Sequence, residues 1–202
     1  MRIIAGQYRG RSLSAPKGRD VRPTSDKVRE SIFSILGARI DLEGLQVLDV
    51  FCGTGALGLE ALSRGAAHCV FIDKSSESLS VARYNAQNLG VPAEAVQFIK
   101  ADAASLKQRT ALYSAGTGNS AGSAATPPQA ADLFFCDPPY KKGLIAPCLQ
   151  ALAQGDYLAA GALGILEAEK GFNANADIPD IFEILQHKKY GDTEIFLVEK
   201  SS

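Results

Sequence analysis

The apolar positions of this 202-residue chain change their period along its length. From residue 46 onward, short apolar runs alternate with stretches in which apolar residues recur every three to four positions. The short runs predict strands and the longer stretches predict helices. The predicted strands lie at 46–51, 69–73, 96–100, 133–136 and 163–168, with helices at 56–64, 76–89 and 144–153. Such alternation is typical of a parallel sheet with crossover helices.

The pattern changes in the last part of the chain. Residues 181–187 and 193–199 both have strand character, and the five residues between them suit a hairpin turn. The sheet should therefore end in an antiparallel pair. The sequence predicts an α/β fold with a mostly parallel, seven-stranded sheet that ends in an antiparallel hairpin.

Two elements are predicted ahead of the sheet. Residues 1–13 alternate around a glycine-containing centre, which predicts a short N-terminal β-hairpin. Helix-start residues after Pro23 and apolar residues at helical spacing predict a helix over 24–36. We therefore divide the chain into a basic arm at 1–23 and a main domain at 24–202. Within that domain, residues 114–131 are uncharged, non-aromatic and rich in small residues, and we expect a flexible surface insertion.

Charge is distributed unevenly along the chain. The net charge is −1, but residues 1–29 carry +6 and the remainder carries −7. The arm is therefore predicted to face a polyanion. The four cysteines form no C-x-x-C pair, the two histidines are expected to be structural, and no metal site is indicated. No apolar run approaches the roughly 18 residues of a membrane span, and we expect a cytoplasmic monomer.

The segment D-V-F-C-G-T-G-A-L-G at 49–58 ends the first predicted parallel strand and opens a helix. Open α/β sheets bind their ligands at this edge. Its three glycines match the G-x-G-x-x-G spacing, so a nicotinamide or flavin dinucleotide is one candidate ligand. The carboxylate of Asp49 favours another, S-adenosylmethionine, because it would repel a pyrophosphate and attract an ammonium or sulfonium group.

Two further acids follow neighbouring strands. Asp73 is suited to accept hydrogen bonds from ribose hydroxyls, and Asp102 is placed to accept one from an adenine amino group. For both residues, the alternative is capping of the helix that follows the strand.

The segment Asp137-Pro138-Pro139-Tyr140 directly follows the apolar run at 133–136. Successive prolines hold the backbone extended and remove two donors, which leaves the Asp137 carboxylate and the Pro138 carbonyl as acceptors. Two acceptors can hold the hydrogens of an exocyclic amine and aim its nitrogen at an electrophilic methyl carbon. Tyr140 can stack on the base that carries the amine. A catalytic histidine is not required.

Together, these segments resemble the bacterial 16S ribosomal RNA guanine-N2 methyltransferase family called RsmD. The resemblance covers nearly the whole chain and is carried by residues 2–6, 8–11, 22–30, 49–66 and 137–140. It implies a Rossmann-like class I methyltransferase fold, S-adenosylmethionine as the methyl donor, and a guanine of 16S rRNA in the small ribosomal subunit or its assembly intermediate as the target. The chain departs from the family at 114–131 and at Tyr140, where phenylalanine is common.

The resemblance also implies residue roles. The cofactor would be bound by Asp49, Gly53, Gly55, Asp73 and Asp102. Catalysis would involve Asp137, Pro138 and Tyr140. RNA phosphates would be bound by arginines of the first 29 residues, namely Arg2, Arg9, Arg11, Arg22 and Arg29.

Other functions are compatible with the same residues. The same chemistry could act on a DNA adenine or a protein glutamine, although the small chain leaves little room for a separate DNA-recognition domain. A non-catalytic RNA-binding or ribosome assembly factor on the same fold is a further alternative. Detectable methyl transfer would exclude the assembly factor, and the identity of the methylated product would separate the enzymes.

Overall fold

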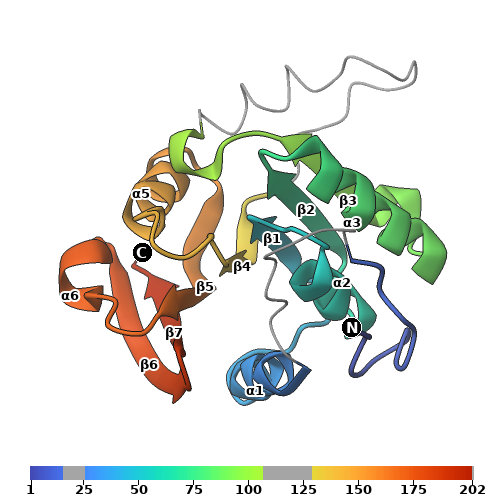
Figure 1. Ribbon diagram of the computed structural model, residues 1–202, viewed down its shortest axis with the longest axis horizontal. Helices are drawn as coiled ribbons and strands as arrows, with labels where there is room; N and C mark the ends of the chain where they lie inside the picture. Colours follow the sequence, from blue (N-terminus) through green and yellow to red (C-terminus); the bar gives the residue numbers. More distant parts are fainter. Residues whose placement is uncertain (16–25, 107–128, 202) are drawn as a thin grey trace.

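The computed structural model describes residues 1–15, 26–106 and 129–201. Its centre is a seven-stranded sheet in the order β3-β2-β1-β4-β5-β7-β6 (Figure 1). The strands are β1 (Gln46–Val50), β2 (His68–Asp73), β3 (Val96–Lys100), β4 (Ala131–Cys136), β5 (Leu158–Glu169), β6 (Phe182–Tyr190) and β7 (Thr193–Lys200). The first five strands pair in parallel, and β7 pairs antiparallel with both β5 and β6. The predicted sheet is confirmed.

Helices cover both faces of the sheet. The helices are α1 (Asp26–Gly37), α2 (Ala56–Ser63), α3 (Ser76–Leu89), α5 (Ile145–Gln154) and the short α6 (Ala174–Asp177), with 3₁₀ turns η1 (Ala93–Ala95) and η2 (Ala103–Ser105). Alternate side chains of each central strand enter opposite cores. Val47 packs in the core with α1, α2 and α3, whereas Leu48 packs in the core with α5. None of the described helices is long and apolar enough to cross a membrane.

Several element boundaries differ from their predicted positions. Strand β5 begins at Leu158 instead of 163, with an irregularity in its pairing to β4, and β6 continues to Tyr190. The hairpin turn therefore consists only of Gly191 and Asp192, with Gly191 at a φ of 62°. Exposed polar side chains cover much of β6, so the alternation of apolar residues did not mark where this strand ends. Most of the predicted insertion at 114–131 lies outside the described residues.

Residues 1–15, the part of the arm that the structure describes, fold back on themselves without forming two full strands. An isolated antiparallel bridge joins Arg2 to Ser12, and the Ile3 amide donates to the Arg11 carbonyl at 3.0 Å. Ile3, Tyr8 and Leu13 are buried in the same core as α1, α2 and α3. The arm therefore packs on the body of the protein (Figure 1).

Buried Glu60 of α2 anchors the arm. Its carboxylate accepts hydrogen bonds from the backbone amides of Ile4 at 2.7 Å and Ala5 at 3.0 Å. The same side chain forms an ion pair with Arg64 one turn later, with 2.8 Å between Nε and Oε1. A charge that is fully removed from water is stable only when its lone pairs are used, and here they are used by the arm and by Arg64.

We predict that Glu60→Ala lowers the free energy of unfolding by about 2–4 kcal/mol, because two buried amides and a guanidinium lose their acceptor. Chemical denaturation would measure the change. Glu183→Ala, at an exposed position of β6, is the matched control and should change the stability by less than about 0.5 kcal/mol. Equal effects of the two variants would contradict the anchoring role of Glu60.

Candidate active site

The candidate site lies at the carboxyl edge of the sheet, at the point where the order of the strands reverses direction. Strand β1 has β2 on one side and β4 on the other, and its last residue Val50 is in register with both Ile72 and Cys136. The residues that follow these strands therefore begin at the same level on neighbouring strands, roughly 5 Å apart. Ligands of open α/β sheets bind at such a switch point.

The glycine loop after β1 has the backbone geometry that its sequence predicts. Gly55 is the N-cap of α2 with a left-handed φ of 76°, which disfavours any side chain. A Cβ on Gly58 would lie 2.5 Å from the sulfur of Cys69, so this glycine permits close packing of α2 on the sheet. Phe51, which opens the loop, also has a positive φ of 59°. For a bulky residue this conformation is strained, as is common at functional sites.

Asp49 is buried beneath this loop. Its carboxylate accepts a hydrogen bond from the Gly58 amide at 3.0 Å, which ties β1 to the first turn of α2. Burial raises the pKa of Asp49 to about 8, the Gly58 hydrogen bond opposes this shift, and the neighbouring charge of Asp73 adds to it. A positive charge bound nearby would favour the ionised carboxylate, and a negative charge would oppose it.

Asp73, at the end of β2, stabilises the loop through backbone contacts. Its two carboxylate oxygens accept from the amides of Gly53 at 3.0 Å and Ser75 at 2.8 Å. Asp102, after β3, is exposed and caps η2 by accepting from the Ala104 amide at 3.1 Å. The alternative role, capping, therefore occurs at Asp102. The carboxylates of Asp73 and Asp102 both keep lone pairs that can accept hydrogen bonds from a ligand.

The segment after β4 lies beside the glycine loop. Asp137 is half-buried and Pro138 is buried, whereas Pro139 is exposed. The ring of Tyr140 is partly exposed, but its hydroxyl is fixed: it lies 3.0 Å from Glu167 of β5 and 2.8 Å from the hydroxyl of Thr193 in β7. Burial raises the pKa of Tyr140 to about 12, so the phenol stays protonated at neutral pH and donates to an acceptor.

Glu167 and Thr193 are site residues that sequence reasoning missed. Both are buried polar residues: Glu167 follows the apolar run of β5, and Thr193 is the first residue of β7. Their polarity was the available signal, since buried polar groups require partners. The partner could not be identified, because Tyr140 is separated from them by 27 and 53 positions.

The arginines predicted to contact RNA have different environments. Arg9 is exposed, and Arg2 is exposed while pairing with Asp26 at 3.6 Å. Arg11 donates to the carbonyls of Leu89 and Asn88 and so caps the last turn of α3. Arg22 lies outside the described residues.

The fifth arginine, Arg29, contradicts its prediction as an RNA contact. Its side chain is 0% exposed and donates to the Arg2 carbonyl and to Asp26. Helical periodicity places Arg29 on the buried face of α1, and the guanidinium links that helix to the arm. It is a structural residue in this conformation.

Asn85 of α3 connects the arm to the glycine loop. Its side-chain amide donates to the carbonyls of Thr54 in the loop and Ser14 in the arm, both at 3.0 Å. Its oxygen accepts from the Ser14 amide at 2.8 Å. One buried side chain therefore fixes the position of the arm relative to the candidate cofactor loop.

Comparisons with known proteins agree with this geometry. Residues 1–199 match the family model described as Conserved hypothetical protein 95. The chain is 33% identical to Ribosomal RNA small subunit methyltransferase D of Escherichia coli strain K12, over all of this chain and 91% of that protein. The solved structure of the Escherichia coli protein yhhF, a candidate methyltransferase, superposes with a TM-score of 0.78 and 30% identity, and covers 100% of this chain and 98% of that one.

A more distant structure shows the same fold. Magnesium protoporphyrin IX methyltransferase from Synechocystis, solved with bound S-adenosylmethionine, has a TM-score of 0.61 and 21% identity, and covers 87% of this chain and 79% of that one. The structural neighbours are class I methyltransferases, and the predicted Rossmann-like class I fold is confirmed.

Asp49 provides a test of the buried charge. Because its pKa is higher in the folded than in the unfolded chain, its contribution to stability is present at low pH and is lost as the pH rises to about 8. We predict that the stability of Asp49→Asn, relative to that of the unmodified protein, increases as the pH rises from 5 to 9. Denaturation across that range would measure it. Asp180→Asn, at an exposed position, is the control. A stability difference that does not vary with pH would contradict a raised pKa.

Proposed function

The chain belongs to the family of Conserved hypothetical protein 95, the RsmD family of methyltransferases, and on this premise we propose that it transfers a methyl group from S-adenosylmethionine to the exocyclic N2 of a guanine in 16S rRNA. The single observation that supports this most directly is the register of β1 with β4. It brings a glycine loop suited to a nucleoside cofactor next to a D-P-P-Y segment suited to a planar amine.

The residues of the loop fit S-adenosylmethionine. Asp73 lies beside the Gly53 amide with lone pairs left for ribose hydroxyls, and Asp102 retains an exposed carboxylate for an adenine amino group. A cationic ligand near buried Asp49 would lower its raised pKa and gain an ionic contact, whereas a pyrophosphate would gain no such contact. When bound, this cofactor supplies an electrophilic methyl group. The loop therefore favours a methyl donor over a dinucleotide.

The D-P-P-Y residues would orient the acceptor. The Asp137 carboxylate and the Pro138 carbonyl accept the two amino hydrogens of guanine and direct the nitrogen lone pair out of conjugation with the ring. The ring of Tyr140 stacks on the base, and its hydroxyl bonds to Glu167 and Thr193 fix the plane of stacking. The amine would lose a proton to Asp137 or water as the new N–C bond forms and the S–C bond of the donor breaks, which leaves S-adenosylhomocysteine.

The reaction itself is tested first. Labelled methyl transfer from S-adenosylmethionine to small ribosomal subunits, taken from a strain lacking this protein, is measured beside naked RNA and DNA, and the product nucleoside is identified. We expect N2-methylguanosine in the subunits. Label found only in DNA or protein would overturn the proposed acceptor, and the absence of label would favour a non-catalytic assembly factor.

We predict that Asp137→Ala lowers methyl transfer by about a hundredfold or more, because the amine loses the acceptor that orients it and takes its proton. Binding of S-adenosylmethionine, measured by calorimetry, should change by less than a few-fold. Asp180→Ala, at an exposed position, is the matched control. Asp156 is not used, because its positive φ would make the substitution strained. Turnover close to that of the unmodified protein would show that Asp137 has no such role.

The two properties of Tyr140 can be separated. Tyr140→Phe keeps the ring and should keep methyl transfer within about tenfold, whereas Tyr140→Ala removes the stacking surface and should raise the KM for RNA by roughly 5- to 150-fold. Steady-state kinetics measures both. Tyr84→Ala removes a tyrosine that is 55% exposed on α3 and serves as the control. If the Phe and Ala variants were equally impaired, the hydroxyl contacts and not stacking would determine the role of Tyr140.

A further inference from the structure

A hollow lies between the arm and the first turns of α1. Its volume is about 260 Å³, and it is lined by Arg2, Ile3, Ile4, Arg9, Gly10, Asp26 and Glu30. Pockets that hold whole small-molecule ligands typically measure about 300–1,000 Å³. This hollow is smaller, and it suits one planar group such as a single base.

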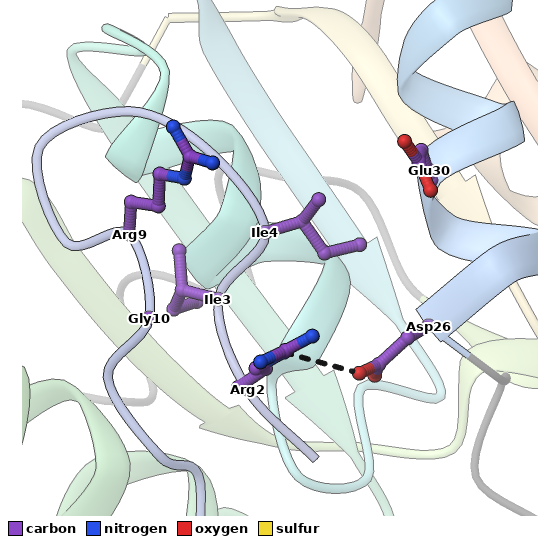
Figure 2. Close-up of a pocket in the computed structure, with 7 residues that line it drawn as sticks. All are labelled: Arg2, Ile3, Ile4, Arg9, Gly10, Asp26 and Glu30. Atoms are coloured by element: carbon purple, nitrogen blue, oxygen red, sulfur yellow. Dashed lines mark ion pairs between the residues drawn. The ribbon is translucent and has the colours of Figure 1, made fainter.

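Arg9 lies on one side of the hollow, and Asp26 and Glu30 lie on the other, where Arg2 pairs with Asp26 (Figure 2). Arg9 projects from the loop of the arm, whereas Asp26 and Glu30 project from α1, one helical turn apart. The side chain of Ile4 lies between the two sides in this view and provides an apolar surface. The Arg9 guanidinium at one end, the Glu30 carboxylate at the other and an aliphatic wall between them match the phosphate, polar edge and face of a nucleotide.

The two acids differ in their contacts. Asp26 pairs with Arg29 at 2.8 Å and with Arg2 at 3.6 Å, so its charge is neutralised within the protein. Glu30 is exposed, and no hydrogen bond or ion pair joins it to another residue in the part of the chain that the structure describes. An unneutralised carboxylate would repel RNA phosphates. Its position is instead suited to a neutral group with N–H donors.

Guanine is the base whose hydrogen-bonding edge best suits a carboxylate. Its Watson–Crick edge presents the N1 and N2 hydrogens side by side, and the two oxygens of one carboxylate can accept both. The amino groups of adenine and cytosine lie next to a ring nitrogen acceptor, and the N3 hydrogen of uracil lies between two carbonyls. These acceptors would repel the second carboxylate oxygen.

The geometry points to a guanine-binding subsite: we infer that this hollow holds an unpaired guanine of the RNA substrate, distinct from the methylated one. Glu30 reads its Watson–Crick edge, Ile4 contacts its face, and Arg9 binds the adjoining phosphate. Phosphate contacts fix the position of an RNA, whereas base contacts select its sequence. The inference rests on the proposed function in that the ligand is part of an RNA substrate.

Mononucleotide binding tests the subsite directly. The full chain, isotopically labelled and saturated with S-adenosylhomocysteine to occupy the cofactor loop, is titrated with GMP, IMP, AMP, CMP or UMP. The amide resonances of Gly10 and Glu30 report binding in the hollow itself, even if GMP also binds beside Asp137. We expect GMP to bind there at least about fivefold more tightly than AMP, CMP and UMP. IMP lacks the N2 amine and should bind more weakly than GMP.

Substitutions test which residues recognise the base and which bind the phosphate. Glu30→Gln replaces one acceptor with a donor and should remove the preference for GMP, whereas Glu94→Gln, at an exposed position in η1, should preserve it. Arg9→Ala should weaken all of the nucleotides similarly, because it removes a phosphate contact. The inference is overturned if Gly10 and Glu30 respond equally to the four common nucleotides, if they respond to none, or if Glu30→Gln retains the GMP preference.

Methylation kinetics separates this inference from the proposed function. With RNA as the substrate, Glu30→Gln should raise the KM by about fivefold or more and leave kcat unchanged, since Glu30 contacts a base that does not react. An unchanged KM with active enzyme would overturn the subsite alone. Absence of methyl transfer by the unmodified protein would overturn the proposed function, and the nucleotide titration would still decide whether the hollow binds guanine.

Discussion

The parallel pairing of β1 with β4 is the constraint on which the candidate site depends. The chain runs from β1 outward to β2 and β3, then returns to the opposite side of β1 as β4. This return brings the loop after Val50 beside the segment after Cys136, although 86 positions of sequence separate the two residues. Backbone hydrogen bonds within the sheet hold both segments, so donor and acceptor groups can be positioned on rigid elements.

The arm adds a second layer of organisation to this edge. Buried acceptors hold its backbone: Glu60 contacts the amides of residues 4 and 5, and Asn85 contacts Ser14 while also binding the Thr54 carbonyl in the glycine loop. An arm that binds RNA through its outer face would thus be attached through its inner face to the candidate cofactor loop. The position of the RNA relative to the cofactor would follow from packing, without a separate recognition domain.

Basic and acidic residues have divided roles in this protein. Within the arm and α1, Arg29 and Arg11 serve the fold, by linking α1 to the arm and by capping α3, whereas Arg9 remains exposed. Among the acids, Asp49 and Asp73 hold the glycine loop through backbone amides. Glu30, by contrast, is exposed at the hollow between the arm and α1, and this difference in surroundings distinguishes it from the structural acids.

The order and type of the main elements and the two loops of the candidate site could be predicted from the chain alone, because periodicity, glycine spacing and the D-P-P-Y segment are local properties of the chain. Which polar residues are buried, and what they contact, depends on how the chain folds. Arg29 proved to be a core residue, the arm proved to be anchored by Glu60, and Tyr140 proved to be held by Glu167 and Thr193. Such contacts join residues far apart in the chain, and their partners are determined by how the helices pack on the sheet.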